Sequence, residues 1–166
     1  MRDYESIMEL RGRDLDLAIA LAMGYRWVWA RVGYINTPEL CVKKAILAKP
    51  GQYEGDSIPD FIDLAQTEQP TDESDRFFGW DEGLPYYHKS LRHAWVLTVD
   101  QGDFTFEEEA DILCASLWPR RFTMDGKRDA LEPIADLNLM FSDFNGYAET
   151  YATARCLLWL MVQEES

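Results

Sequence analysis

Hydrophobic positions predict helices near both ends of the chain. Residues 14–23, DLDLAIALAM, are mostly apolar after Asp14, whose side chain can cap the first turn, and Gly24 is placed to end the helix. Toward the other end, residues 152–163 read ATARCLLWLMVQ, and Thr150 or Thr153 can cap a helix there. One face of that helix would carry the apolar side chains Ala154, Leu157, Leu158, Met161 and Val162.

Strict alternation predicts a strand at residues 25–32, YRWVWARV. One face of this strand would be wholly aromatic, with Tyr25, Trp27 and Trp29. The dipeptides Asp125–Gly126 and Asn145–Gly146 indicate hairpin turns, because both favour the tight turn between antiparallel strands and both have strand-like neighbours.

Two further segments have mixed signals. Residues 37–51, TPELCVKKAILAKPG, begin with Thr37 as an N-cap and stop at Pro50–Gly51, which predicts a helix. Residues 105–119, TFEEEADILCASLWP, place Thr105 and Glu108 at the spacing of a capping box, followed by apolar residues at helical intervals. This pattern favours a helix slightly, although ILCASLW could also be a buried strand.

The stretch LPYYHKSLRHAWVLTVD, residues 84–100, holds both histidines of the chain. Its spacing predicts an amphipathic helix with Trp95 in the core and with Lys89 and Arg92 facing water. His88 and His93 would lie about 140° apart around such a helix, so they cannot share a metal ion from one helical face.

Periodicity is lost between residues 53 and 85, where Gly, Pro, Asp, Glu and Ser dominate. A stretch of this length without a pattern is typical of a surface insertion or lid. We therefore expect a single domain, 1–166, with an acidic insertion or lid at 53–85. The predicted strands are few and antiparallel, with helices before, between and after them, so the expected fold class is α+β.

The net charge of −14 is concentrated in the same region. Between Tyr53 and Glu82 ten acidic residues stand against one base, Arg76. Direct binding to nucleic acid is not expected, because phosphates require clustered Lys and Arg. The acidic segment is either a solvated loop that aids solubility or a decoy for a basic groove on another protein.

Compartment signals are consistent with a cytoplasmic protein. No apolar run approaches the ~20 residues that a membrane-spanning helix needs, and the charged start MRDYESIMELRGRD does not resemble a signal peptide. Cys41, Cys114 and Cys156 are odd in number and widely spaced, which favours reduced thiols.

The sequence carries no motif of an enzyme, a metal site or a cofactor site. Phosphate-binding and dinucleotide-binding glycine loops, the HExxH pattern and the EF-hand loop are all absent. The three cysteines lie within apolar runs and look like core residues. The carboxylates of EEEAD, 107–111, could hold a cation but are more typical of solvated charges. We expect no catalytic residues, no metal and no cofactor.

A binding site for a small anionic ligand is the more promising chemistry. Flat rings can stack on a nucleotide base, and a few cations can meet its phosphates, whatever the sign of the net charge. The candidate ligand-binding residues are Trp80, Tyr86, Tyr87, Lys89, Arg92, Arg120 and Arg121. A pocket of this kind often forms between copies of one chain, so a homo-oligomer is expected.

Three blocks of the sequence resemble the phage ABA sandwich domain family. The middle block matches at Leu84, Pro85, Tyr87, Ala94 and Trp95. The first block matches at Gly24, Tyr25 and Trp27, and the last at Thr150, Ala154, Cys156, Leu157 and Leu158. His88 stands where the family usually has serine, and residues 101–138 match nothing in it.

This resemblance implies a layered α-β-α sandwich with a small antiparallel sheet and no established catalytic residues. It also implies a bacteriophage or prophage protein that acts in the host cytoplasm. The leading hypothesis is a non-enzymatic accessory protein that counters host defence by sequestering a nucleotide immune signal. The alternatives are an acidic inhibitor that blocks a basic groove of a host defence protein, and a virion accessory protein.

Overall fold

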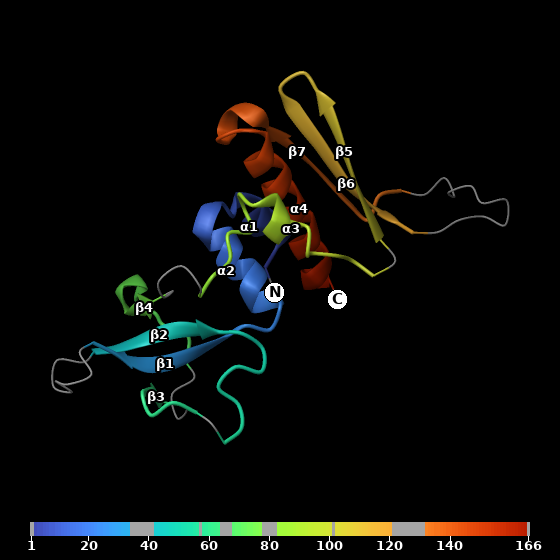
Figure 1. The fold of residues 1–166 in the computed structure, drawn as a ribbon. Helices are drawn as coiled ribbons and strands as arrows, with labels where there is room; N and C mark the ends of the chain where they lie inside the picture. The colour runs from blue at the N-terminus through green and yellow to red at the C-terminus, as the bar shows by residue number, and fades with distance from the viewer. Residues whose placement is uncertain are drawn as a thin grey trace. The chain divides into compact units, whose positions relative to one another are not determined.

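The chain forms two compact units in a computed structural model that describes residues 2–33, 42–56, 58–63, 68–77, 83–100, 102–120 and 132–165. Unit 1 comprises Met1–Ile19 and Tyr86–Ser166, and unit 2 comprises Ala20–Pro85. Helices lie near both chain ends and each unit contains antiparallel strands (Figure 1), so the predicted α+β class is confirmed. A single domain with 53–85 inserted into it stays a prediction.

Unit 2 is built on a sheet with the strand order β3-β1-β2-β4. Its centre is the antiparallel pair β1 (Arg26–Val32) and β2 (Val42–Ala48). Two very short strands flank it: β3 (Ile62–Asp63), antiparallel to β1, and β4 (Arg76–Phe77), parallel to β2. The strand predicted at 25–32 is confirmed.

The helix expected at 37–51 is wrong for the part that is described, because residues 42–48 form β2. Thr37 lies outside the described residues. Pairing along seven positions, from Arg26–Ala48 to Val32–Val42, satisfies the backbone of both strands and buries Ala45, Leu47 and Ala48. Intrinsic helix preference is a weak signal, and the partner strand overrides it here.

Both faces of β1 are buried within unit 2. Val28 and Ala30 pack with Ala48 and Ile62 in a small apolar core. On the other face Trp27 and Trp29 are only 6% and 9% exposed, and the Trp29 indole donates to the Glu68 carbonyl oxygen at 2.9 Å. The aromatic face of the predicted strand therefore contributes to packing.

Basic residues of β1 and β2 hold part of the acidic segment against the sheet. Arg31 donates to the Asp60 carbonyl at 2.8 Å, Lys43 pairs with Asp63 at 2.9 Å, and Lys44 donates to the Ser74 carbonyl. Segments of 53–85 therefore add strands β3 and β4 and the short 3-10 turn η2 (Glu73–Asp75) to unit 2.

Helix α2 (Gly12–Ala22) confirms the first predicted helix, although it begins before Asp14, which lies in the first turn instead of capping it. The C-terminal end of α2 lies in unit 2, and the helix ends just before Gly24, as the sequence predicts. Gly24 has φ +91°, and the amides of Gly24 and Tyr25 donate to Leu21 and Ala20 carbonyls at 3.1 and 3.0 Å. This Schellman arrangement requires the left-handed backbone that glycine tolerates.

Unit 1 contains a three-stranded antiparallel sheet, β5-β6-β7. The strands are β5 (Gly102–Glu109), β6 (Ile112–Pro119) and β7 (Ala135–Met140). The helix favoured at 105–119 is therefore wrong, and the alternative of a buried strand is confirmed. Leu113, Ala115 and Leu117 are fully buried while the residues between them are not, which is the two-residue period of a strand.

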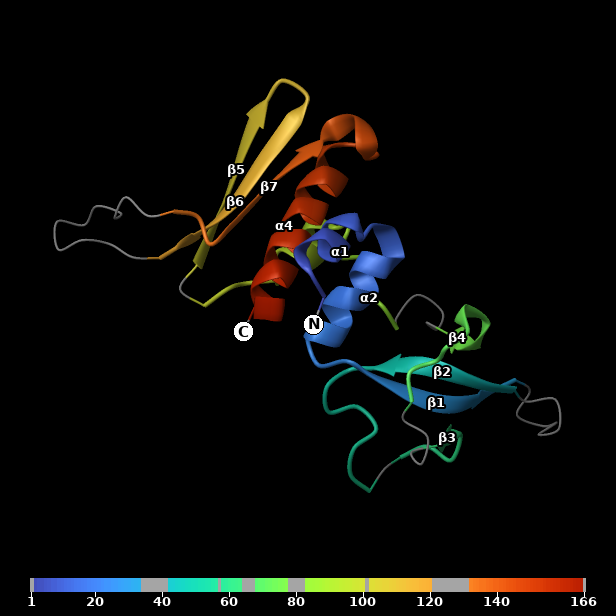
Figure 2. The same cartoon turned by 180° about the vertical axis from the view of Figure 1, so that it is seen from behind.

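Helix α4 (Tyr147–Glu165) is the central element of unit 1. Strands β6 and β7 pack on it, and so do helices α1 (Tyr4–Glu9) and α3 (Leu91–Ala94). Figures 1 and 2 show α4 between the sheet and these helices. Every residue from Ala152 to Met161 is buried, as expected of a helix covered on all sides. A second helical layer on the outer face of the sheet stays a prediction.

Three local predictions around α4 are wrong. Asn145–Gly146 leads from the 3-10 turn η3 (Phe141–Asp143) into α4 instead of closing a hairpin. Neither predicted threonine caps the helix: Thr150 donates to the Gly146 carbonyl at 2.9 Å, and Thr153 donates to the His88 carbonyl at 3.0 Å. Asp125–Gly126 lies outside the described residues.

The amphipathic helix expected at 84–100 is reduced to the single turn α3, capped by Ser90. Lys89 and Arg92 are exposed as predicted, but Trp95 is 46% exposed and does not lie in the core. Leu97 is buried in its place. The chain leaves the helix after Ala94, so the residue spacing that placed Trp95 inward no longer applies.

A tyrosine–carboxylate pair links α4 to β5 and gives a pH-dependent prediction. The Tyr151 hydroxyl donates to Glu108 at 2.7 Å, and this bond raises the pKa of Tyr151 to about 12. The pair stabilises the fold fully below pH ~10, the ordinary tyrosine pKa, and the contribution disappears as pH rises toward 12. Ultraviolet absorbance titration should show one late tyrosine transition that moves earlier in Glu108→Gln, and an unchanged curve in that variant would contradict the assignment.

None of the helices among the described residues is long and apolar enough to span a membrane.

Candidate functional site

The residues predicted to bind a ligand fall at two separate places in unit 1. Tyr86 and Lys89 lie together, with the Lys89 ammonium 4.2 Å from the centre of the Tyr86 ring. Arg120 follows β6 and lines a pocket that includes neither Tyr86 nor Lys89. Tyr87 is 3% exposed, so its side chain is buried, whereas Arg92 is exposed. Trp80 and Arg121 lie outside the described residues.

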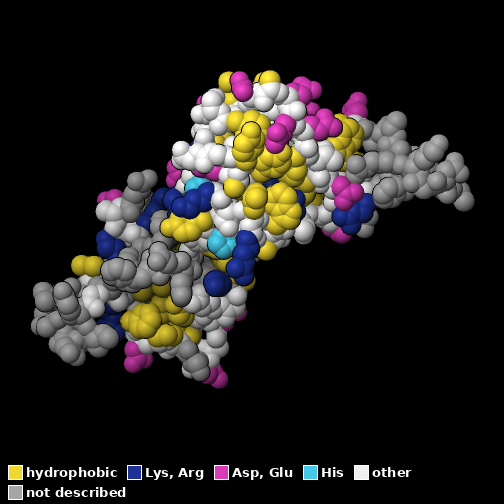
Figure 3. Space-filling model, turned by 45° about the horizontal axis from the view of Figure 1, so that its top comes forward, with side chains coloured by type: hydrophobic (Ala, Val, Ile, Leu, Met, Phe, Trp, Pro, Cys, Tyr) yellow, Lys and Arg dark blue, Asp and Glu magenta, His cyan; other side chains and the backbone are white. Residues whose placement is uncertain are grey.

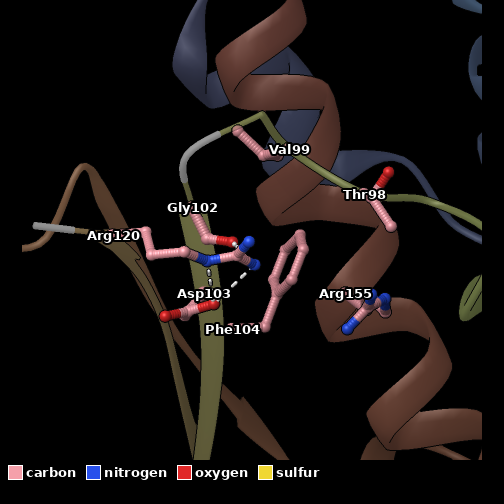
Figure 4. Close-up of a pocket in the computed structure, with 7 residues that line it drawn as sticks. All are labelled: Thr98, Val99, Gly102, Asp103, Phe104, Arg120 and Arg155. Carbon is pink, nitrogen blue, oxygen red and sulfur yellow. Dashed lines mark hydrogen bonds and ion pairs between the residues drawn. The ribbon is translucent and has the colours of Figure 1, made fainter.

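The pocket near Arg120 has a volume of about 320 Å³. The segment after α3, the start of β5, the end of β6 and the middle of α4 each contribute to its wall (Figure 4). Its lining residues are Thr98, Val99, Gly102, Asp103, Phe104, Arg120 and Arg155.

Arg155 is the most unusual residue of this pocket, because a charged side chain only 8% exposed lies in the middle of the apolar helix α4. Its Nε donates to the carbonyls of Ala94 and Leu97, both at 3.1 Å, and Nη2 donates to Leu97 at 2.8 Å. Its guanidinium carbon lies 4.6 Å from the centre of the Trp95 ring and 4.1 Å from that of Phe104. Two carbonyls and two aromatic faces therefore fix its position.

The guanidinium of Arg155 retains binding capacity. An arginine has five N–H donors, and the bonds above use Nε and one position on Nη2. No acidic residue among those described forms an ion pair with it. Burial lowers the pKa of Arg155, which is the expected cost of removing a charge from water.

The second cation of the pocket, Arg120, is held in place by two other residues that line the pocket. Its guanidinium pairs with Asp103 at 2.8 Å and donates to the Gly102 carbonyl at 3.2 Å. Figure 4 shows the Phe104 ring between the Arg120 and Arg155 side chains. With Asp103 neutralising one cation, the pocket keeps a net positive charge in a strongly acidic chain.

Gly102 lets the backbone close this end of the pocket. A Cβ at this position would lie 3.1 Å from a methyl carbon of Leu117 and 3.2 Å from one of Val99. The Gly102 amide also donates to the Val99 carbonyl at 3.1 Å. The absence of a side chain therefore allows β5 to start in close contact with the preceding segment.

A second polar cluster surrounds the fully buried carboxylate of Asp16 in α2. Asp16 accepts from Arg13 at 2.8 Å, from the His88 amide at 2.8 Å, and contacts His88 Nδ1 at 2.8 Å. The Arg13 guanidinium in turn lies 4.1 Å from the centre of the Tyr86 ring. This cluster ties α2 to the segment that carries the predicted residues Tyr86 and Lys89.

Asp16 and Arg155 were both missed by reasoning from the sequence. Arg155 is the one charge inside the apolar run ATARCLLWLMV, and Asp16 has a leucine on either side of it in DLDLAIALAM, which also contains Asp14. A charged residue is almost never fully buried unless its charge is paired, hydrogen-bonded or bound to a ligand. That signal was present in the sequence and would have identified both residues.

The described residues contain no group of His, Cys, Asp or Glu that could hold a metal ion. Cys156 is buried as predicted, and burial raises the pKa of its thiol. Cys114 is partly exposed on the outer face of β6, and Cys41 lies outside the described residues.

Comparison with known protein families, with curated proteins and with solved structures gave no match. The resemblance to the phage ABA sandwich family therefore stays a prediction.

Proposed function

We propose that this protein binds a small anionic ligand in the pocket of unit 1 and does not transform it. The observation that carries the proposal is the buried guanidinium of Arg155, which lines the pocket with unused N–H donors and no carboxylate partner among the described residues. Burying a cation without a counter-ion is costly, and a bound anion would supply the missing charge.

The shape and chemistry of the pocket support the ligand class that we propose. A volume of about 320 Å³ is near the lower end of small-molecule sites, which run from roughly 300 to 1,000 Å³. Arg120 and Arg155 offer planar donor groups suited to phosphate or carboxylate, and Phe104 offers an aromatic surface. A nucleotide combines both features and is the ligand that we propose.

The biological role that we propose follows the resemblance noted in the sequence. A phage accessory protein in the host cytoplasm would bind a nucleotide immune signal and keep it from its receptor. The same proposal includes a second layer of helices on the outer face of the β5-β6-β7 sheet, which would complete the α-β-α sandwich. It also includes assembly into a homo-oligomer.

Calorimetric titration of the purified protein with AMP, cyclic dinucleotides and inorganic phosphate tests the proposal. We expect saturable binding of a nucleotide that is weakened at least tenfold in Arg155→Met, since a hydrogen bond to a charged group contributes roughly 1.5–3 kcal/mol. Mass spectrometry of small molecules released by heating protein purified from cells extends the search to other anions.

Arg2→Met is the matched control, because Arg2 is exposed and does not line the pocket. This variant should bind like the original protein. If Arg155→Met is poorly folded, Arg120→Met provides the second test of the same pocket. The proposal fails if no nucleotide or released metabolite binds, or if binding is unchanged in both pocket variants.

The acidic inhibitor remains a second candidate function, favoured by exposed carboxylates of unit 2. Asp56, Asp60 and Asp72 are exposed, whereas Asp63 is already paired with Lys43. Binding of a basic host protein that weakens with salt, and that is lost when these three acids are neutralised, would support this candidate.

A further inference from the structure

A buried carboxylate holds the imidazole of His88 in one orientation. Asp16 is fully buried, and its two carboxylate oxygens accept from the His88 backbone amide and from His88 Nδ1, both at 2.8 Å. The His88 carbonyl accepts from Thr153 at 3.0 Å, so both polar groups of its backbone are bonded. Because a carboxylate only accepts hydrogen bonds, Nδ1 carries the ring proton and Nε2 keeps a lone pair.

The Nε2 atom of His88 is open to solvent. It bonds to none of the described residues and is not a buried atom, and the His88 side chain is 12% exposed. His93, the other histidine of the chain, has a buried Nδ1 without a partner, and no acid among the described residues pairs with its ring. Figure 3 shows histidine side chains at the surface with Lys and Arg side chains beside them.

Two cations lie close to a ring that neighbours His88. The centre of the Tyr86 ring is 6.3 Å from that of His88, with the Arg13 guanidinium at 4.1 Å and the Lys89 ammonium at 4.2 Å from it. Arg13 is paired with Asp16, whereas no acid among the described residues forms an ion pair with Lys89. Lys89 is therefore the cation whose charge is not neutralised.

Bases outnumber acids on the two segments that form this cluster. Residues 10–22 and 84–95 contain two acids, Asp14 and Asp16, of which Asp16 is the partner of His88. The four bases of these segments are Arg11, Arg13, Lys89 and Arg92. An anionic reagent therefore meets locally positive segments in a chain whose net charge is −14.

We propose that His88 accepts a phosphoryl group at Nε2 from a small acyl phosphate. The Nε2 lone pair attacks phosphorus, the N–P bond forms, and the P–O bond to the acyl group breaks, so the carboxylate leaves with the electron pair. Nδ1 keeps its proton, and the ring becomes a cation that the Asp16 carboxylate stabilises. Asp16 is thus a positioning residue for His88. The small exposed fraction of His88 favours a small donor molecule, and this site is independent of the anion pocket.

Incubation of the full chain with acetyl phosphate at neutral pH tests the proposal, with peptide mass spectrometry and phosphorus NMR as readouts. We expect one phosphoryl group on His88 and none on His93, which serves as the control within the same chain. The phosphorus spectrum should show the Nε2 isomer. The group should be stable in alkali and lost in acid, as expected of a nitrogen–phosphorus bond.

Variants separate the attacking nitrogen from the residue that positions it. His88→Gln removes the Nε2 lone pair but keeps an N–H donor for Asp16, so the modification should be lost, whereas the matched control His93→Gln should retain it. Asp16→Asn should slow the modification at least tenfold, because the Asn amide can donate to Nδ1 and leave the ring proton on Nε2. Nitrogen NMR of the imidazole detects this change of tautomer, which a loss of stability alone would not produce.

Peptide mapping of the unaltered chain decides the matter even where a variant folds poorly. Equal modification of His93, phosphorylation at Nδ1, acetylation of Lys89 without phosphorylation of His88, or an unchanged rate in a folded Asp16→Asn variant would each overturn the proposal.

Discussion

Replacing Asp16 with Ala is expected to lower the free energy of unfolding by about 1–3 kcal/mol, the usual cost of leaving hydrogen-bonding groups without the buried acceptor that they had. The Asp16 carboxylate is fully buried and interacts with Arg13 and with two groups of His88. Its loss leaves the His88 amide without this acceptor and removes one of the interactions of Arg13. Urea denaturation followed by circular dichroism measures the change.

Asp14→Ala is the matched control for this prediction. Asp14 lies two residues earlier in the same helix, is exposed, and occupies the first turn, where an acid contributes at most about 1 kcal/mol. A loss of similar size in both variants would show that the buried cluster around Asp16 contributes little.

Replacing Leu158 with Ala is expected to cost about 2–5 kcal/mol, the range for a buried leucine whose removal leaves a cavity. Leu158 is completely buried in the middle of α4, which has the sheet on one side and helices on the other. Elements packed on both sides of α4 restrict the collapse that would fill the cavity, so the cost should lie in the upper half of that range.

The same substitution at Leu91 provides the comparison. Leu91 is 41% exposed, so Leu91→Ala should cost less than about 1 kcal/mol. Thermal unfolding offers an independent check, since each kcal/mol corresponds to about 2–4 °C for a chain of this size. Leu158→Ala losing no more stability than Leu91→Ala would contradict the central position of α4.

The candidate site shows how much of a binding site can be predicted from residue types alone. Arg120 was selected from the sequence as a scarce cation near aromatic residues, and the structure places it in a pocket. Its companions Arg155 and Phe104 come from distant segments, and no spacing in the sequence connects them to Arg120. Tyr86 and Lys89 do lie together, because they are close neighbours in the chain, but their cationic companion is Arg13 from α2.

The sequence by itself determined the elements that depend on local chemistry. Gly24 ends α2, strict alternation gives β1, and the long apolar run near the chain end gives α4. These signals depend on backbone conformation and side-chain period, which neighbouring residues are sufficient to define.

Only the tertiary structure decided the secondary structure of residues 42–48 and 105–119. Their sequences favour helices, but in the structure these segments form strands. It also decided that Trp95 is exposed while Arg155 is buried. The physical reason is that hydrogen-bonded partners and burial are supplied by segments far away in the chain. Their contribution outweighs the fraction of a kcal/mol per residue by which local preferences differ.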